Sequence, residues 1–314
     1  MCTALTFGKN GSCFGRNLDL ERGYGEQVVI TPRNFSLPFR FLPPLKHHYA
    51  MIGMAAVANN YPLYFEATNE KGLSIAGLNF PGNAHYQPHT PGRRNVAPFE
   101  LIPWLLGTCA DLGQVSEELG KLNVVNCSFS PELPVSALHW IIASGGESLV
   151  LECTKEGMKV HKNPFGVLTN NPTFDFHRLN VSHYMSVHSG GAENRLSDRL
   201  PLENFSLGLG AMGLPGDFSS ASRFVKTVFV RENSLCGDTE EARVNQFFHI
   251  LQSVAMPKGC VRVPSGEFED TRYSCCCTAD TLRYYYTTYD NMSLRSHCLW
   301  DADPEGTALT LFPM

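Results

Sequence analysis

The chain has 314 residues, of which 43% are hydrophobic and 18% charged, and its formal net charge is −5. This composition is typical of a globular protein with a large core, and it does not favour nucleic acid or an anionic membrane as partner. No apolar stretch approaches the ~20 residues of a membrane-spanning helix, and Lys9 and Gly11 interrupt the layout of a signal peptide. We therefore expect a cytoplasmic protein that does not insert into membranes.

The first part of the chain is predicted to form strands and then helices. Strand-like runs lie at 3–7, 13–20, 27–31, 50–58, 64–67 and 73–78. The turn-forming residues 9–11 predict a hairpin between the first two runs. Two helices are expected at 97–106 and 112–122, because apolar residues of the second recur at helical spacing on one face.

The rest of the chain continues the same alternation. Strands are expected at 137–144, 148–153, 158–161, 273–278, 281–289 and 294–300, helices at 221–231 and 241–254, and an irregular region from about 188 to 222. Strands in hairpins favour antiparallel sheets. We expect one domain spanning residues 1–314, of the α+β class. Its expected architecture is an αββα four-layer sandwich, two antiparallel sheets flanked by helices.

Several patterns in the sequence could suggest a metal or cofactor site, but none of them fits one. The eleven cysteines are scattered apart from Cys275-Cys276-Cys277, no Cys-x-x-Cys pair exists, and the histidines match no ligand pattern. The segment 208–213 spells a dinucleotide fingerprint, but no strand leads into it and Pro215-Gly216 prevents a helix after it. We expect neither a metal nor a cofactor, and we expect the cysteine triplet to pack in the core.

Cys2 is the most informative residue of the sequence. Once Met1 is removed, as is usual before a small residue, Cys2 carries both a thiol and a free α-amine. The ordinary pKa of the amine is about 7.7–8.0 and that of the thiol about 8.5, so proton exchange between them costs little. A nucleophile paired with an N-terminal amine is a known variant of the Ser–His arrangement. Taken alone, position 2 is more simply explained as a frayed end, but its neighbours favour catalysis.

Arg16 and Asp19 are the first of these neighbours. Residues three apart in a strand point to opposite faces unless the chain bends, so an ordinary surface pair of little energetic value is the alternative. The predicted hairpin would bring both residues beside Cys2. Arg16 would then favour the thiolate, and Asp19 would hold the α-amine by a charge-assisted hydrogen bond.

Two asparagines form the second part of the predicted site. Asn79 and Asn170 each end a strand-like run shortly before a proline. Either residue alone is most often a turn former. Together, their side-chain amides could converge as hydrogen-bond donors toward a developing oxyanion.

With these residues in place, the chain resembles the choloylglycine hydrolases, which comprise bile salt hydrolases and penicillin V acylases within the N-terminal-nucleophile superfamily. The matching pieces occur in the family's order and span nearly the whole chain. They are Met1-Cys2-Thr3, Phe14-Gly15-Arg16-Asn17-Leu18-Asp19, Asn69-Glu70-Lys71-Gly72-Leu73, Ala76-Gly77-Leu78-Asn79-Phe80-Pro81-Gly82, Leu138-His139-Trp140, Leu168-Thr169-Asn170-Asn171-Pro172-Thr173-Phe174, Gly213-Leu214-Pro215-Gly216-Asp217 and Ala221-Ser222-Arg223-Phe224.

The resemblance implies roles for the candidate residues. Cys2 is the nucleophile of an amide hydrolase, Arg16 and Asp19 orient and polarise it, and a thioester acyl-enzyme forms. Asn79 and Asn170 serve the oxyanion site, and Arg223 supports the site. The family's assembly loop corresponds to residues 188–222, which implies a homotetramer.

The resemblance also implies a substrate. In the bile-salt branch it is a steroid acid joined to glycine or taurine, which implies a bacterial source and an apolar pocket. The pocket would be lined by Leu18, Phe65, Phe129, Leu133 and Leu138. Asn79 favours this branch, since some penicillin V acylases carry Tyr there. Penicillin V acylase, N-acyl homoserine lactone acylase and a non-catalytic binder of bile acids remain the alternatives.

Overall fold

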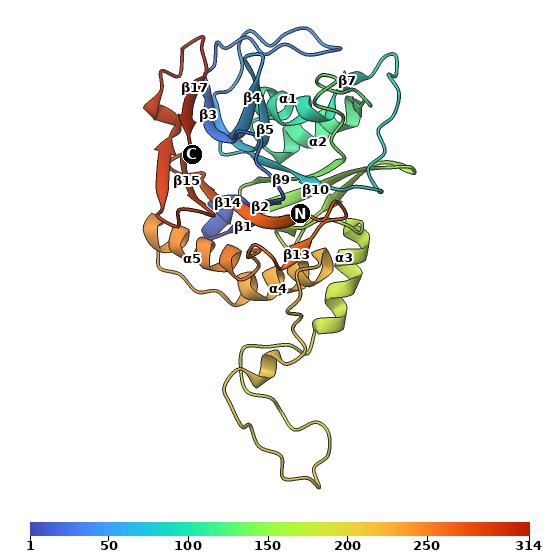
Figure 1. The fold of residues 1–314 in the computed structure, drawn as a ribbon, viewed down its shortest axis with the longest axis vertical. Helices are drawn as coiled ribbons and strands as arrows, with labels where there is room; N and C mark the ends of the chain where they lie inside the picture. Colours follow the sequence, from blue (N-terminus) through green and yellow to red (C-terminus); the bar gives the residue numbers. More distant parts are fainter.

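The computed structural model describes residues 1–314, apart from the side chain of Asn10. Two β-sheets stack face to face, and helices cover their outer faces (Figure 1). One outer layer contains α1 (Leu101–Thr108) and α2 (Leu112–Lys121), and the other contains α3 (Phe174–Val181), α4 (Ser220–Asn233) and α5 (Glu240–Gln252). The predicted αββα sandwich is therefore confirmed.

The seven-stranded sheet carries the N-terminus. Its strands are β1 (Cys2–Phe7), β2 (Cys13–Leu20), β12 (Val167–Leu168), β13 (Val261–Arg262), β14 (Phe268–Thr278), β15 (Arg283–Thr288) and β16 (Arg295–Cys298). Their order is β12-β1-β2-β14-β15-β16, with β13 beside β14, and every pairing is antiparallel. β1 thus lies between the hairpin partner β2 and a strand from the middle of the chain.

The eight-stranded sheet faces it. Its strands are β3 (Gln27–Thr31), β4 (Met51–Ala58), β5 (Tyr61–Asn69), β6 (Ser74–Asn79), β9 (Leu138–Ser144), β10 (Glu147–Thr154), β11 (Gly157–Lys162) and β17 (Thr310–Pro313). The order β11-β10-β9-β6-β5-β4-β3-β17 is antiparallel throughout. A small parallel pair, β7 (Arg94–Val96) and β8 (Leu122–Val124), completes the strands. Single turns of 3-10 helix are η1 (Lys9–Gly11), η2 (Pro98–Glu100), η3 (Ser182–Tyr184), η4 (Leu209–Ala211) and η5 (Leu299–Asp301).

The β1–β2 hairpin is buried along its whole length. Its register pairs Cys2 with Leu18 and Ala4 with Arg16, so these four side chains share one face of the sheet. Gly15 is required at its position, because a Cβ there would lie 1.9 Å from the carbonyl oxygen of Cys275 on β14. The close approach of β2 to β14 explains why the sequence places a glycine inside a strand.

The structure departs from the predicted elements mainly in short segments. The strands β7, β8, β13 and β17 and the helix α3 were not predicted, because two to four strand residues or eight helical residues give little periodic pattern, whereas β12 corresponds to the expected strand-like run before Asn170. The irregular region ends at Ser219 rather than near 222. Ser219 starts α4 early because its hydroxyl accepts a hydrogen bond from the backbone N–H of Ser222 at 3.3 Å. As predicted, the cysteine triplet of β14 is buried.

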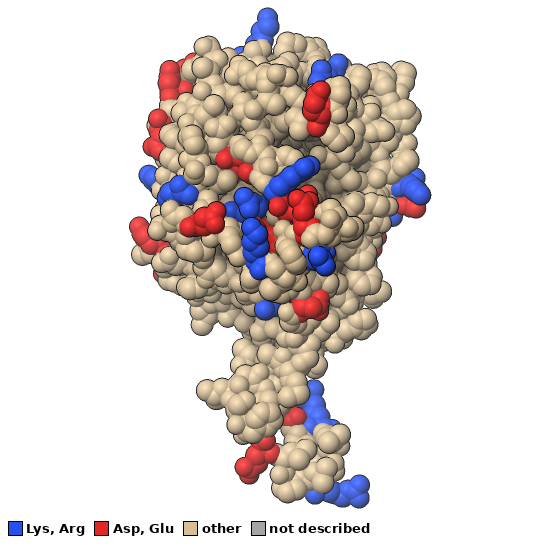
Figure 2. All heavy atoms as spheres, in the orientation of Figure 1, with Lys and Arg blue, Asp and Glu red and all other residues tan. Residues whose placement is uncertain are grey.

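A long excursion leaves the globular body between η3 and α4. We call residues 185–219 the arm; Figure 1 shows it projecting beyond the helices of the lower layer. Figure 2 shows it as a narrow projection that carries charged residues of both signs. Within the described residues, no helix combines the length and apolarity needed to traverse a bilayer.

Candidate active site

Cys2 is held by three separate elements. Its backbone N–H donates to Asn170 Oδ1 at 2.8 Å, and its carbonyl accepts a hydrogen bond from Arg223 of α4. Arg223 Nη1 also donates to Thr3 Oγ1 at 2.6 Å. Cys2 is 1% exposed. The segment after β12, the start of α4 and the β1–β2 hairpin therefore meet at the predicted nucleophile.

Met1 precedes Cys2 in the structure and occupies a defined place. Its amine donates to the carbonyl of Asp19 and to Glu269 Oε1, the latter at 2.7 Å, while the backbone N–H of Asp19 donates to the Met1 carbonyl at 2.9 Å. The nitrogen of Cys2 is consequently a peptide nitrogen. A thiol and a free amine on one residue require that Met1 be removed.

Arg16 lies between the two sheets and is fully buried. Nη1 donates to the carbonyls of Gly77 at 2.6 Å and Phe65 at 3.1 Å, while Nη2 has no hydrogen-bond partner among the described residues. Burial alone would lower the pKa of Arg16, but the nearby Cys2 thiol and the buried acidic groups beside it raise the pKa above its ordinary value. The guanidinium is therefore charged and close to Cys2.

Glu66 of β5 is the carboxylate opposite Arg16, at 3.7 Å from Nη1. It accepts hydrogen bonds from the hydroxyls of Tyr273 at 2.7 Å and Tyr284 at 2.6 Å, and from the Cys275 thiol at 3.5 Å. Burial raises the pKa of Glu66, and Arg16 and these donors oppose that effect. Glu66 was not predicted, because its only signal in the sequence is a single carboxylate in a mostly apolar strand.

Asp19 points to the other face of the seven-stranded sheet, as strand alternation predicts. Its Oδ1 accepts a hydrogen bond from Thr271 Oγ1 at 2.6 Å, and its Oδ2 has no partner in the described part of the chain. Burial raises the pKa of Asp19, and the charge of Arg223 opposes this. Arg16 and Asp19 are both buried, on opposite faces of the sheet, so they are not the surface pair that was the alternative.

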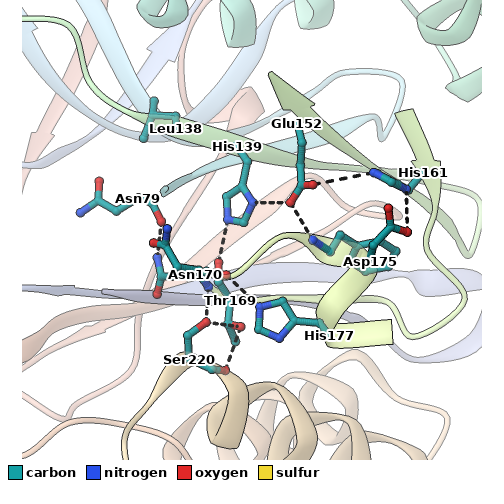
Figure 3. Close-up of polar contacts among 12 residues, drawn as sticks. Asn79, Leu138, His139, Glu152, His161, Thr169, Asn170, Asp175, His177 and Ser220 are labelled. Atoms are coloured by element: carbon teal, nitrogen blue, oxygen red, sulfur yellow. Dashed lines mark hydrogen bonds and ion pairs between the residues drawn. The ribbon is translucent and has the colours of Figure 1, made fainter. Parts of the chain in front are cut away.

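Asn170 contacts Cys2, but the two predicted amides do not converge. Asn170 Oδ1 also accepts from Arg223 Nη2 at 2.8 Å, and its Nδ2 donates to the backbone carbonyl of Asn79 at 2.7 Å. Figure 3 shows the side chain of Asn79 directed away from Asn170. Asn79 pairs with Leu138 across β6 and β9, so their side chains share a face.

Four of the five predicted pocket residues belong to two separate apolar groups. Leu18 and Phe65 belong to the core group that includes Cys2. Phe129 and Leu138 belong to the group under α1 and α2, where Phe129 packs edge-on against Phe99 at 5.2 Å between ring centres. Leu133 lies in a turn before β9. None of the five lines the cavities of about 570 Å³, around Arg33 and Glu70, or about 400 Å³, around Lys9 and Arg243.

This arrangement suits a nucleophile that becomes anionic. The Cys2 side chain shares one face of the hairpin with Arg16, and Arg223 of α4 donates to the Cys2 carbonyl, so two cations flank the residue on which a negative charge would form. A buried anion is stable only when opposite charges or donors face it. The groups around Cys2 can therefore support covalent catalysis by a thiolate.

Comparison with known proteins agrees with this site. Residues 2–309 match the model of the linear amide C–N hydrolases, choloylglycine hydrolase family. The chain is 48% identical over 314 residues to a bile salt hydrolase/transferase of Lactiplantibacillus plantarum, covering 100% of this chain and 97% of that protein.

Solved structures give the same picture. A variant of conjugated bile acid hydrolase from Clostridium perfringens superposes with a TM-score of 0.92 at 33% identity, covering 100% of this chain and 97% of the other. Penicillin V acylase from Agrobacterium tumefaciens gives a TM-score of 0.76 at 18% identity, covering 99% of this chain and 90% of the other. The latter similarity concerns the fold alone.

Proposed function

The chain belongs to the linear amide C–N hydrolases of the choloylglycine hydrolase family, and we propose that it hydrolyses the amide bond between a bile acid and glycine or taurine. The observation that carries this proposal is the placement of Cys2, whose nitrogen is held by Asn170, whose carbonyl accepts a hydrogen bond from Arg223, and whose side chain shares a face of the hairpin with Arg16. A bile salt hydrolase/transferase and a conjugated bile acid hydrolase are among the proteins that match the chain over its full length.

The first step is removal of Met1, which converts the Cys2 nitrogen into an α-amine. Asn170 Oδ1 already accepts a hydrogen bond from that nitrogen, so it can orient the amine toward the thiol. The unpartnered Oδ2 of Asp19 and the charge on Arg16 complete the surroundings of the pair. The amine then takes the thiol proton, directly or through water.

The thiolate attacks the amide carbonyl and forms a tetrahedral oxyanion. The second N–H of Asn170 Nδ2 donates to this oxyanion, and the Asn79 amide joins it once its side chain turns toward the bound substrate, while Arg223 keeps Asn170 and the Cys2 carbonyl in place. The protonated amine gives its proton to the leaving nitrogen, which departs as glycine or taurine. Water hydrolyses the remaining thioester and releases the bile acid.

The steroid is proposed to lie against the apolar residues near Cys2 and Asn79. Leu18 is the strand partner of Cys2, and Leu138 is the strand partner of Asn79. Phe65 joins the same core group as Cys2, and Phe129 and Leu133 come from the segment leading into Leu138. Apolar walls with a few fixed polar groups are the usual composition of sites for amphipathic ligands.

We further propose that the enzyme is a cytoplasmic homotetramer. The arm exposes large apolar side chains, namely Met185, Leu196, Leu200, Leu202, Phe205, Leu207 and Met212. Side chains of this kind are usually covered by another copy in a symmetric assembly. All eleven cysteines carry free thiols, as is usual in a reducing compartment.

The test compares substrates with the processed enzyme. Release of glycine from glycocholate and taurine from taurocholate is expected, with slow or no turnover of penicillin V. Faster turnover of penicillin V would move the substrate to the acylase branch. Stoichiometric binding of glycocholate without turnover would indicate a bile-acid-binding protein rather than an enzyme.

A further inference from the structure

A buried polar pair lies behind Asn170, on its side away from Cys2. His139 of β9 and Glu152 of β10 are both fully buried and face the segment 169–174, which follows β12 of the other sheet (Figure 3). His139 Nε2 lies 2.9 Å from the carbonyl oxygen of Thr169. Glu152 Oε1 accepts a hydrogen bond from the backbone N–H of Phe174 at 2.9 Å. The pair therefore tethers both ends of the segment that carries Asn170.

The contacts of His139 fix its ring between two oxygen atoms. Its Nδ1 lies 3.2 Å from Glu152 Oε1, and its Nε2 lies beside the backbone carbonyl of Thr169. A buried polar pair gives little net stability compared with apolar residues of the same volume. The effect of the pair is therefore expected in the geometry that it fixes.

The backbone of Asn170 is fixed by two further groups. Its N–H donates to Ser220 Oγ at 2.8 Å, and its carbonyl oxygen lies 2.8 Å from His177 Nε2. Burial lowers the pKa of His177 to about 4, so its ring is neutral at pH 7 and donates from Nε2. With its backbone held on both sides, Asn170 presents its side chain to Cys2 and to Asn79.

We propose that the His139–Glu152 pair is a positioning device that holds Asn170 in the orientation that the Cys2 amine needs. This inference rests on the proposed function, because it concerns a residue of the same site. Neither member of the pair touches the reacting atoms; both act through the 169–174 segment. Small misplacements of an orienting group carry large kinetic costs, which gives an otherwise structural pair a measurable effect on rate.

The sharpest variant is Glu152→Gln, which preserves the shape of the side chain. One oxygen, Oε1, lies 3.2 Å from His139 Nδ1 and accepts a hydrogen bond from the backbone N–H of Phe174. A glutamine can place either an oxygen or an NH2 there, so one of the two tethers is weakened. We expect kcat on glycocholate to fall roughly 10- to 100-fold with KM nearly unchanged, after correction for the fraction of alkylatable Cys2.

The matched control is His161→Gln. His161 Nε2 lies 3.7 Å from Glu152 Oε2, at the outer, partly exposed end of the same network, and no contact links it to Thr169 or Asn170 among the described residues. We expect wild-type kcat from this variant. A second, milder variant, Ser220→Ala, removes the acceptor of the Asn170 N–H and is expected to lower kcat severalfold; it serves if Glu152→Gln does not fold.

A double-mutant cycle separates positioning from general damage. If the pair acts through Asn170, the effect of Glu152→Gln on kcat disappears in an Asn170→Ala background. Wild-type kcat in Glu152→Gln, or an undiminished effect in the Asn170→Ala background, would overturn the proposal. Should the wild type release no amino acid from glycocholate, the proposed function fails. The same cycle is then read from the rate of Cys2 alkylation by iodoacetamide, which needs no substrate.

Discussion

The region around Cys2 buries charged side chains, whereas the arm exposes apolar ones. Around Cys2, charged groups such as Arg16 and Glu66 are buried and face one another. Along the arm, apolar side chains meet solvent; Leu207 is 100% exposed, whereas Cys2 is 1% exposed. Buried polar groups fix one geometry, and exposed apolar groups associate with another surface. We therefore propose that the body contains the chemistry and that the arm supplies assembly.

This contrast predicts that catalysis and assembly can be changed separately. Changes around Cys2 should alter the rate and leave the assembly unchanged, whereas changes in the arm should alter the assembly and leave the chemistry of each chain unchanged. A variant that changes both the rate and the assembly would contradict this prediction. The variants below test it from the largest expected effect to the smallest.

Replacing the nucleophile has the largest expected effect. Cys2→Ser should fold and assemble as the wild type but lose at least about 10³-fold in kcat, because a hydroxyl is a far weaker nucleophile than a thiolate. Glycine release from glycocholate measures the loss. The control is Cys236→Ser, at an exposed cysteine, which should retain full activity. Wild-type turnover by Cys2→Ser would remove Cys2 from the mechanism.

Removing the Asn79 amide tests the oxyanion site. Its side chain points away from Asn170 in the structure, so Asn79→Ala should disturb the packing of Cys2 little (Figure 3). We expect kcat to fall about 10²–10³-fold, the usual cost of losing one oxyanion donor, at unchanged melting temperature. An unchanged kcat would show that this amide faces the pocket without serving the reaction.

Stability should depend on pH through His177. Its pKa is about 4 in the folded chain, chiefly because of burial, against 6.5 ordinarily. The unfolded chain binds this proton first, so the free energy of unfolding falls as pH drops from about 6.5 to 4, by up to about 3 kcal/mol. His177→Gln cannot titrate, so its urea unfolding curves should show a weaker decline over this range. Identical declines in both proteins would contradict the assignment.

The arm should affect assembly alone. Leu207→Lys places a charge in the exposed apolar group and is expected to shift the oligomer toward smaller species, measured by light scattering after size exclusion. Leu235→Lys is the matched control, because Leu235 is 89% exposed but lies on the body between α4 and α5. Its assembly should be unchanged. The same oligomeric state in both variants would show that the arm does not mediate assembly.

The sequence predicted the site where the signal was local. The hairpin of residues 3–20 follows from two short strands and a turn, and alternation correctly separated Arg16 from Asp19 onto opposite faces. The sequence could not predict Glu66 as the partner of Arg16, because that contact joins strands of different sheets. The convergence of the two asparagines was likewise expected from type and position, but side-chain direction at a strand end depends on tertiary packing.

The same limit applies to the support of Asn170. His139 stands in one of the recognised motifs, yet nothing in the sequence pairs it with Glu152 or with the carbonyl of Thr169. These partners meet only when β9, β10 and the segment after β12 are packed together. Motifs therefore identified the residues near the reaction, and the structure was needed to find the residues that hold them.

The most direct test of the central claim joins the intact mass of the purified protein with amino-acid release from glycocholate and taurocholate. Loss of one Met residue together with release of glycine or taurine is the predicted result. Processed protein that turns over neither conjugate would contradict bile salts as substrates, and full activity with Met1 still attached would contradict the free amine of Cys2 as the base.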